Sequence, residues 1–446
     1  MTSPTTTQQA ETTQLDLRDP SFRDRAYGIY DDLRAGCPMS KVRFVTRDDD
    51  GGALPGDDRR REMLEGDCWL VTHFDEGVEA MLDDRFTVNP ARLLPPEQLA
   101  AMQAQAAAAD NELGRALGRN LLNLDPPDHT RLRRLVQPSF TGRNIAAMDD
   151  RVRRIAADLL DAAEREAAER GESAPNRTMD LVRSFAYPLP VTVISDMVGI
   201  PAEDRGKART WTENLLKIDR ADPEQAADIQ QRLLEFVDYL KDLFEKRRRE
   251  PQDDLISRLV RAEEDGDTLS PDELLSMVFI VYVAGFVTTV NLIGNVTVGL
   301  LSHTDALAAF RADPSLARNA VEETLRFWGP AESTLPRTAM EDVEIGGVVI
   351  RAGERIRAGL AAMDRDPEKF ANPNVYDITR ADANRHVAFG KGVHVCLGAP
   401  LARLEGEIAV ETLFGRYPEL RLAVPREEIR WSQDLLRGFE RIPLLF

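Results

Sequence analysis

The sequence predicts a mainly α-helical fold with small β-sheets, built as one large domain. Strand-like runs lie near the two ends of the chain, whereas the middle reads as successive amphipathic helices. No stretch is rich enough in Gly, Pro or Ser to act as a linker, so we expect one domain where the length of 446 residues alone would give about three. Residues 1–20 are predicted to form a flexible tail ahead of a domain spanning 21–446.

Composition and charge exclude several classes of protein. Hydrophobic residues make up 43% of the chain and charged residues 30%, values typical of a folded globular protein. The formal net charge of −19 repels nucleic acid and anionic lipid surfaces, so neither is an expected partner. No signal peptide is readable, and the longest apolar run, 277–287, is short of the roughly 20 residues that span a bilayer. We expect a monomeric cytoplasmic protein.

Three cysteines, Cys37, Cys68 and Cys396, have no paired spacing that could make a disulfide framework or a thiolate zinc site. This usage fits a reducing compartment. Cys396 is considered separately below because of the loop in which it lies.

The N-terminal third is predicted to contain two strands and one exposed helix. Val42–Val45 and Cys68–Thr72 read as strands, and the Asp/Gly-rich stretch between them, around 48–52, reads as a loop. Leu99–Ala109 is rich in Ala and Gln and has high helix propensity but little apolar periodicity. We interpret it as a mobile helix beside an access route.

Amphipathic helices are predicted in the middle of the chain, where apolar residues recur at helical spacing. The first group follows Met148 and the second lies before residue 250: Val152, Ile155, Leu159, Ala162, Ala163, and Ile229, Leu233, Phe236, Val237, Leu240, Leu243, Phe244.

The best-defined helix begins at Ser270, with Pro271 in its first turn and Glu273 closing a capping box. Apolar residues continue on all sides to about Leu301, which predicts a buried rod of roughly 45 Å. Its middle, 284–289, reads Ala-Gly-Phe-Val-Thr-Thr, although glycine there costs about 1 kcal/mol relative to alanine. One interpretation is a packing notch or kink; the other is that a flat group lies against the backbone with a hydroxyl beside it.

After this helix, 344–349 read as a hairpin with a Gly-Gly turn, and a meander follows over 364–384. The loop 389–398, Phe-Gly-Lys-Gly-Val-His-Val-Cys-Leu-Gly, precedes an apparent helix. A lone cysteine is usually a small buried hydrophobe. Here three glycines allow backbone N–H groups to point at the sulfur, and the helix N-terminus stabilises a thiolate, so the loop predicts a site for an anionic sulfur ligand.

Two other interpretations of this loop are weaker. Val395 stands where a dinucleotide-binding glycine motif needs its third glycine, and no βαβ unit surrounds it. A nucleophilic cysteine would need a base, and His394 is too close in sequence to pair well with Cys396 on an extended loop.

The loop resembles the haem-binding signature of the cytochrome P450 family, F-x-x-G-x-x-x-C-x-G, in its soluble bacterial form. Four further features follow in the order that this family has: 125–133 (Asp-Pro-Pro-Asp-His-Thr-Arg-Leu-Arg), Ala284-Gly285 to Thr288, the pair Glu323 and Arg326, and a meander ending at Arg380. With the early strands, the resemblance covers nearly the whole chain and implies the single-domain cytochrome P450 fold.

The resemblance implies a haem b cofactor, O2 as co-substrate and Cys396 as the axial thiolate ligand of the haem iron, which favours O–O cleavage. It also implies four residues that bind the haem propionates: His129, Arg133, Arg337 and His394. Alone, His129 and Arg133 would be an ordinary pair on one helix face. Glu323, Arg326 and Arg380 are implied to form a buried structural network, whereas spacing alone allows only an exposed ion pair of well under 1 kcal/mol.

Thr288 falls where the family keeps a hydroxyl that bonds iron-bound dioxygen and helps to relay protons. Val287 occupies the position of the acid that commonly assists this relay. Proton delivery then has to use water, Thr289, another side chain or the substrate. Either a substrate group completes the relay or the enzyme performs a less usual oxidation.

Electrons need an outside source, since the chain has no flavin or nicotinamide fingerprint and no cysteine cluster. The resemblance implies a ferredoxin and its reductase, fed by NAD(P)H. Four basic residues are candidates for the docking patch, although they could equally be ordinary solvated side chains: Arg131, Arg134, Lys391 and Arg403.

We therefore expect a monooxygenase that hydroxylates or epoxidises an apolar small molecule, with a secondary metabolite such as a macrolide or other polyketide implied by the resemblance. The candidate pocket residues are Phe286, Val287, Ser333, Thr334, Leu335 and Phe439. The alternatives are a peroxide-driven or atypical haem-thiolate oxidation and a haem-binding sensor without turnover.

Overall fold

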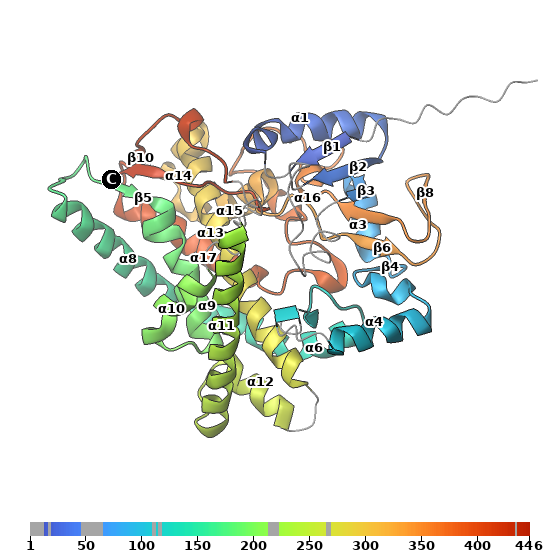
Figure 1. Ribbon diagram of the computed structural model, residues 1–446. Coiled ribbons are helices and arrows are strands. Elements are labelled where there is room, and N and C mark those ends of the chain that lie inside the picture. The colour runs from blue at the N-terminus through green and yellow to red at the C-terminus, as the bar shows by residue number, and fades with distance from the viewer. Residues whose placement is uncertain are drawn as a thin grey trace, which may run out of the picture.

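Helices form most of the molecule, and the strands gather mainly at one side (Figure 1). The computed structural model describes residues 13–16, 19–45, 66–108, 113–114, 118–212, 223–264, 269–432 and 435–446. The helices are α1 (Pro20–Gly36), α3 (Phe74–Leu82), α4 (Pro96–Ala108), α6 (Asp128–Val136), α7 (Gly142–Ala146), α8 (Asp149–Glu169), α9 (Pro188–Val198), α10 (Arg205–Thr212), α11 (Pro223–Arg249), α12 (Leu255–Glu264), α13 (Pro271–Ser302), α14 (Thr304–Ala312), α15 (Ala317–Trp328), α16 (Leu360–Met363) and α17 (Ala399–Arg416). The strands are β1 (Thr13–Asp16), β2 (Met39–Val45), β3 (Gly66–Val71), β4 (Phe86–Thr87), β5 (Thr178–Asp180), β6 (Arg337–Ala339), β7 (Val343–Ile345), β8 (Val348–Ile350), β9 (Arg355–Ala358), β10 (Arg421–Leu422) and β11 (Pro443–Leu445).

The largest sheet has the strand order β1-β2-β3-β9-β6-β4. The two predicted N-terminal strands are present as β2 and β3, and they pair in antiparallel fashion. The predicted loop between them lies outside the described residues. The expectation of a flexible tail over residues 1–20 is wrong for 13–16, because β1 pairs in parallel with β2 and buries Leu15. Asp19, whose side chain accepts a hydrogen bond from the Ser21 N–H, caps α1.

Two smaller sheets complete the strands. The predicted Gly-Gly hairpin is β7 and β8, with Gly346 and Gly347 at φ 56° and 77°. These positive φ angles at both central positions are those of a type I′ turn, which glycine adopts without strain. The third sheet, β10-β11-β5, joins the C-terminal residues to the middle of the chain.

The predicted central helix is α13, and its N-terminal capping box is present. The Ser270 side chain accepts from the Glu273 N–H at 3.2 Å, and the Glu273 carboxylate accepts from the Ser270 N–H at 3.0 Å. Glu273 also accepts from Arg131 at 2.7 Å and from Arg119 at 3.1 Å. The start of α13 is therefore joined to α6, the helix that carries Arg131.

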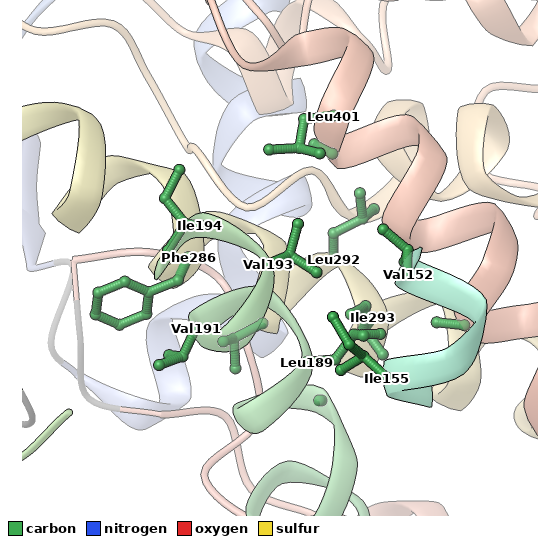
Figure 2. Packing of buried hydrophobic residues seen from close by; sticks show 14 of the residues in the cluster. Val152, Ile155, Leu189, Val191, Val193, Ile194, Phe286, Leu292, Ile293 and Leu401 are labelled. Atoms are coloured by element: carbon green, nitrogen blue, oxygen red, sulfur yellow. The ribbon is translucent and has the colours of Figure 1, made fainter. Parts of the chain in front are cut away.

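The core lies where α13 meets α9, α15 and α17. Figure 2 shows apolar side chains of α8 and α9 packed over α13, with Leu401 of α17 beyond. A Cβ atom on Gly285 would lie 2.8 Å from the Ile194 side chain, so no larger residue fits there without movement. The packing-notch interpretation of Gly285 is therefore confirmed.

The length and hydropathy of α13 would suffice to cross a bilayer, and it is the one such helix in the described part of the chain. However, 67% of its most apolar window is buried inside the protein. We therefore assign it as a core helix. The other predicted helices also form, as α4, α8 and α11, and α4 begins three residues earlier than predicted, at Pro96.

Candidate active site

The cysteine loop is closed by backbone hydrogen bonds between its two ends. The Cys396 N–H donates to the Phe389 carbonyl at 2.9 Å, and the Val395 N–H donates to the Gly392 carbonyl at 3.0 Å. Gly390 and Gly392 have φ angles of 68° and 75°, which residues with a side chain rarely adopt. The two glycines thus allow the turn that brings the cysteine to the start of α17.

Cys396 is exposed to solvent, although many protein atoms surround its sulfur. Burial raises the pKa of its thiol, whereas hydrogen bonds from the backbone N–H groups of Gly398 and Ala399 lower that pKa. The positive charges of Arg133 and Arg403 act in the same direction as these N–H groups. The predicted arrangement of N–H groups and a helix N-terminus around the sulfur is therefore present. A metal cation bound to such a sulfur removes its proton outright.

His129, Arg133, Arg337 and His394 surround one region beside this loop. The rings of His129 and His394 lie 4.5 Å apart between centroids. The Arg133 guanidinium donates to the Val393 carbonyl at 3.0 Å, and that of Arg337 donates to the Met81 carbonyl at 2.7 Å. The four residues come from α6, from β6 and from the cysteine loop itself.

This cluster of two guanidinium groups and two imidazoles fits a ligand that carries carboxylates. Burial, His129 and Arg337 together lower the pKa of His394 to about 4. Burial also lowers the pKa of His129, whose Nε2 atom is buried without a hydrogen-bond partner in the described structure. An anion placed here would accept a hydrogen bond from this nitrogen and be attracted by the charges of Arg133 and Arg337. The accessible thiol and the adjacent cations form the donor set that a haem with its two propionates requires.

Asp125 is a further residue of this region, and no role was predicted for it. Its carboxylate accepts a hydrogen bond from the Thr87 hydroxyl and another, at 3.1 Å, from the Val88 N–H. Arg92 lies 3.5 Å from the same carboxylate. Asp125 thus ties β4 to the residues just before α6. Its position directly before Pro126, in the stretch used for the resemblance, was the only available signal.

The middle of α13 presents different residues on its two sides. Ala284 is exposed and Thr288 is half-buried, and the Thr288 hydroxyl donates to the Ala284 carbonyl at 3.1 Å. Gly285 faces Ile194, and the Thr289 hydroxyl is buried and donates to the Gly285 carbonyl at 3.3 Å. The small residue that leaves space beside the Thr288 hydroxyl is therefore Ala284 rather than Gly285.

Two of the predicted pocket residues lie in the core instead. Phe286 is 2% exposed, and its ring packs against those of Tyr187 and Tyr282, with ring centroids 5.7 Å apart in both pairs. Phe439 is 4% exposed and stacks on Trp431 at 4.0 Å. Both assignments are wrong because these rings fill gaps between packed elements. The remaining four candidates are half-buried: Val287, Ser333, Thr334 and Leu335.

Glu323, Arg326 and Arg380 lie together in the interior. The Glu323 and Arg326 side chains have no exposed surface, and two parallel hydrogen bonds of 2.7 Å join them. The Arg380 guanidinium lies 3.3 Å from the same carboxylate. Arg326 also donates to the carbonyl groups of Asp364, Pro373 and Val375. The network fastens α15 to the meander.

Two of the four predicted docking residues are engaged inside the protein. Arg131 pairs with Glu273, and Arg403 pairs with Glu322 at 2.5 Å. Of the four candidates, Arg134 and Lys391 are the exposed ones.

Glu405 of α17 is a buried carboxyl group that belongs to none of the predicted haem-binding, pocket, structural or docking residues. It has no exposed surface, and neither of its oxygens has a hydrogen-bond partner in the described structure. Burial raises the pKa of this carboxyl well above its ordinary value of 4.5. The group is therefore protonated in the folded protein under conditions in which the unfolded chain releases the proton.

Glu405→Gln is expected to stabilise the protein increasingly as the pH rises. Above the unfolded pKa of 4.5, unfolding releases the Glu405 proton, so wild-type stability falls by about 1.4 kcal/mol per pH unit until the folded pKa is reached. The amide has no such proton. Urea unfolding at pH 5, 6.5 and 8 measures the difference, with Glu411→Gln as control, because Glu411 of the same helix is half-buried and paired with Arg153. A difference that does not depend on pH would contradict the assignment.

The site thus has the features of a haem-thiolate protein, with a cysteine sulfur at a helix N-terminus and cations placed for the propionates. Comparison with known proteins agrees with this class. The family model described as Cytochrome P450 matches residues 99–428. The chain belongs to the cytochrome P450 family.

Individual relatives are similar over nearly their whole length. The chain is 43% identical to cytochrome P450 107B1 of Saccharopolyspora erythraea over 85% of this chain and 89% of that one. It is 39% identical to 6-deoxyerythronolide B hydroxylase of the same organism, over 97% of this chain and 99% of the other. Among solved structures, myxobacterial CYP267B1 in complex with myristic acid has 38% identity and a TM-score of 0.80, covering 96% of this chain and 98% of the other.

The predicted fold and the predicted enzyme class are confirmed by these comparisons. Family membership implies a haem-thiolate iron and the use of O2. The relatives are named as hydroxylases and monooxygenases, so the alternative of a haem-binding sensor without turnover is wrong.

Proposed function

We propose that this enzyme uses O2 and externally supplied electrons to hydroxylate or epoxidise an apolar small molecule. Bound haem would supply the oxidising chemistry, with Cys396 as the ligand of its iron. The observation that carries the proposal is the solvent-exposed Cys396 just before α17, together with the buried Nε2 atom of His129, which has no hydrogen-bond partner among the described residues.

The chain's own residues have distinct roles in this proposal. The His129, Arg133, Arg337 and His394 side chains bind the propionates and so orient the cofactor. Ala284 leaves room beside the Thr288 hydroxyl, and the Thr288 Oγ1 atom holds a proton for delivery at the oxygen-binding position. Glu323, Arg326 and Arg380 keep α15 and the meander in place. The half-buried Val287, Ser333, Thr334 and Leu335 form part of the substrate pocket.

The substrate class that we propose is a macrolide or another polyketide. This assignment is supported by relatives whose names refer to such molecules, among them 6-deoxyerythronolide B hydroxylase and a Bacillus subtilis protein named polyketide biosynthesis cytochrome P450 PksS. The structure of the tirandamycin C-bound monooxygenase TamI has a TM-score of 0.80 and 34% identity to this chain. The apolar character of Val287 and Leu335 fits a ligand of this kind.

We further propose that a ferredoxin and its reductase deliver electrons from NAD(P)H to a monomeric enzyme in the cytoplasm. The exposed Arg134 and Lys391 would contact the ferredoxin, because a small basic area can guide an acidic partner to an otherwise acidic protein.

The function is tested with purified full-length enzyme loaded with haem. A thiolate ligand gives the reduced carbonmonoxy form a red-shifted Soret band. Addition of macrolactones should shift the haem spin state, and those that bind should be oxidised when ferredoxin, reductase and NAD(P)H are supplied. A colourless protein after growth with ample iron, or a carbonmonoxy band without the red shift, would contradict the proposal.

Val287→Glu is expected to increase the fraction of NAD(P)H consumption that yields product. A positioned acid contributes roughly 10²–10⁴-fold to a proton transfer, and Val287 offers no acid. The measurement is the ratio of product formed to NAD(P)H consumed. Val287→Gln is the matched control, since it has nearly the same size and no proton to give. If the ratio of product to consumed NAD(P)H is the same in Val287→Glu and Val287→Gln, an acid at position 287 is not what limits proton delivery.

A second candidate is oxidation driven by peroxide. The apolar Val287 favours it, because a peroxide already carries the protons and electrons that the relay and the ferredoxin would otherwise supply. Product formation with hydrogen peroxide and no reductase, at a rate at least equal to that of the ferredoxin system, would favour this candidate.

A further inference from the structure

A second polar network lies next to the cysteine loop and includes Arg403, one of the predicted docking residues. Glu322 of α15 accepts two hydrogen bonds from Arg403 of α17, at 2.5 and 3.0 Å. The His386 Nε2 atom lies 3.0 Å from Glu322 Oε2, the oxygen that also accepts the longer of the two bonds from Arg403. The Glu322 and His386 side chains are 6% and 1% exposed. We call Glu322, His386 and Arg403 the Glu322 triad.

The protonation states of the Glu322 triad follow from its hydrogen bonds. The Ala388 N–H donates to the His386 Nδ1 atom at 3.1 Å, so the imidazole proton is on Nε2 and is donated to Glu322. Burial lowers the pKa of His386 and keeps its ring neutral. Burial raises the pKa of Glu322, but the hydrogen bonds from His386 and Arg403 outweigh this effect and bring it to about 2. The triad therefore contains one negative and one positive charge.

Two contacts join the Glu322 triad to Phe389, the first residue of the cysteine loop. The Arg403 guanidinium lies 4.7 Å from the centroid of the Phe389 ring, and the His386 ring lies 5.9 Å from the same ring. The Phe389 carbonyl accepts the hydrogen bond from the Cys396 N–H. The triad thus holds the residue that closes the loop around the sulfur.

The charge of Arg403 also reaches the sulfur, since Arg403 lies in the second turn of α17, the helix that begins just after Cys396, and packs on the Phe389 ring. The Glu322 carboxylate is paired with Arg403, and its negative charge offsets part of the positive charge of Arg403. Without the carboxylate, more of the positive potential of Arg403 would reach the sulfur. Groups outside the direct ligands of a metal tune it in this way through charge and hydrogen bonding.

We propose that Glu322 is a positioning residue that sets, through Arg403 and His386, the electron-donating strength of the Cys396 thiolate and hence the reduction potential of the haem. The inference rests on the proposed haem-thiolate function. A thiolate under a stronger positive potential donates less to the iron, and the reduced state is then favoured.

The test compares the reduction potential of the full-length, haem-loaded wild type with that of variants in which the charge of Glu322 or of Arg403 is removed. Glu322→Gln should shift the potential in the positive direction, and Arg403→Gln should shift it in the negative direction. Glu322→Asp keeps the charge and should remain close to wild type. Glu411→Gln is the matched control, because Glu411 lies on α17, the helix that carries Arg403, and its carboxylate pairs with Arg153 of α8 at 2.7 Å.

Opposite shifts in the two charge-removing variants, with Glu411→Gln unchanged, would support the role of Glu322. Equal potentials in all variants, or shifts of the same sign for Glu322→Gln and Arg403→Gln, would overturn it. Should Glu322→Gln fail to fold, the sign of the Arg403→Gln shift decides. A wild-type protein without the red-shifted carbonmonoxy band would instead refute the haem-thiolate function, so the two failures are distinguishable.

Discussion

Arg326→Leu is expected to lower the free energy of unfolding by about 3–5 kcal/mol, because it leaves the buried Glu323 carboxylate without its principal partner. Both side chains are fully buried, and Arg326 additionally satisfies three backbone carbonyl groups of the meander. A loss of this size is a large part of the total stability of an ordinary domain, roughly 5–15 kcal/mol. Denaturant unfolding of the purified variant and its haem content after expression measure the effect.

The matched controls separate charge from geometry. Arg326→Lys keeps the charge but loses the parallel pair of hydrogen bonds, and it should fall between wild type and Arg326→Leu. Glu323→Gln combined with Arg326→Leu removes both charges and should cost less than the sum of the single changes. Additive losses in this double-mutant cycle would mean that the pair is not coupled as its geometry implies.

Cys396→Ser is expected to abolish the red-shifted carbonmonoxy band and to reduce product formation by at least about 10³-fold. The serine hydroxyl keeps nearly the same size, but it is a far weaker ligand and donates less electron density. The spectrum of the reduced protein under carbon monoxide and the rate of product formation are measured on the same sample. Cys37→Ser serves as the control, since Cys37 is a free cysteine in the residues just before β2. A red-shifted band that survives in Cys396→Ser would refute the ligand assignment.

Features set by neighbouring residues could be predicted from the sequence. The capping box of α13 depends on Ser270 and Glu273, which are three residues apart, and it forms as expected. The hairpin around Gly346 and the N–H groups that surround the Cys396 sulfur are likewise local. In each case the backbone geometry follows from residue types within one or two turns of chain.

Features that depend on distant partners could not be predicted. β1 is four residues long and exists because β2, some 26 residues later, offers an edge to pair with. Arg131 and Arg403 read as free surface cations, since nothing in the sequence marks Glu273 and Glu322 as their partners. Ion pairs between residues that are 142 and 81 positions apart carry no local signal.

The direction in which the α13 side chains point could not be predicted from the sequence either. α13 is apolar nearly all round, so its pattern does not distinguish the side that packs against α9 from the side that carries Ala284 and Thr288. For that reason Phe286 was assigned to the pocket although it fills the core.

The Glu273 carboxylate has a mechanical consequence for the whole site. It is at once the cap of α13 and the acceptor for Arg131 of α6. A large substrate that displaces the first turn of α13 therefore has to move α6 as well or break the hydrogen bond between Arg131 and Glu273. Since α6 also carries His129 and Arg133, the residues proposed to bind the propionates, a displacement of the first turn of α13 would be transmitted to them through the Glu273 side chain.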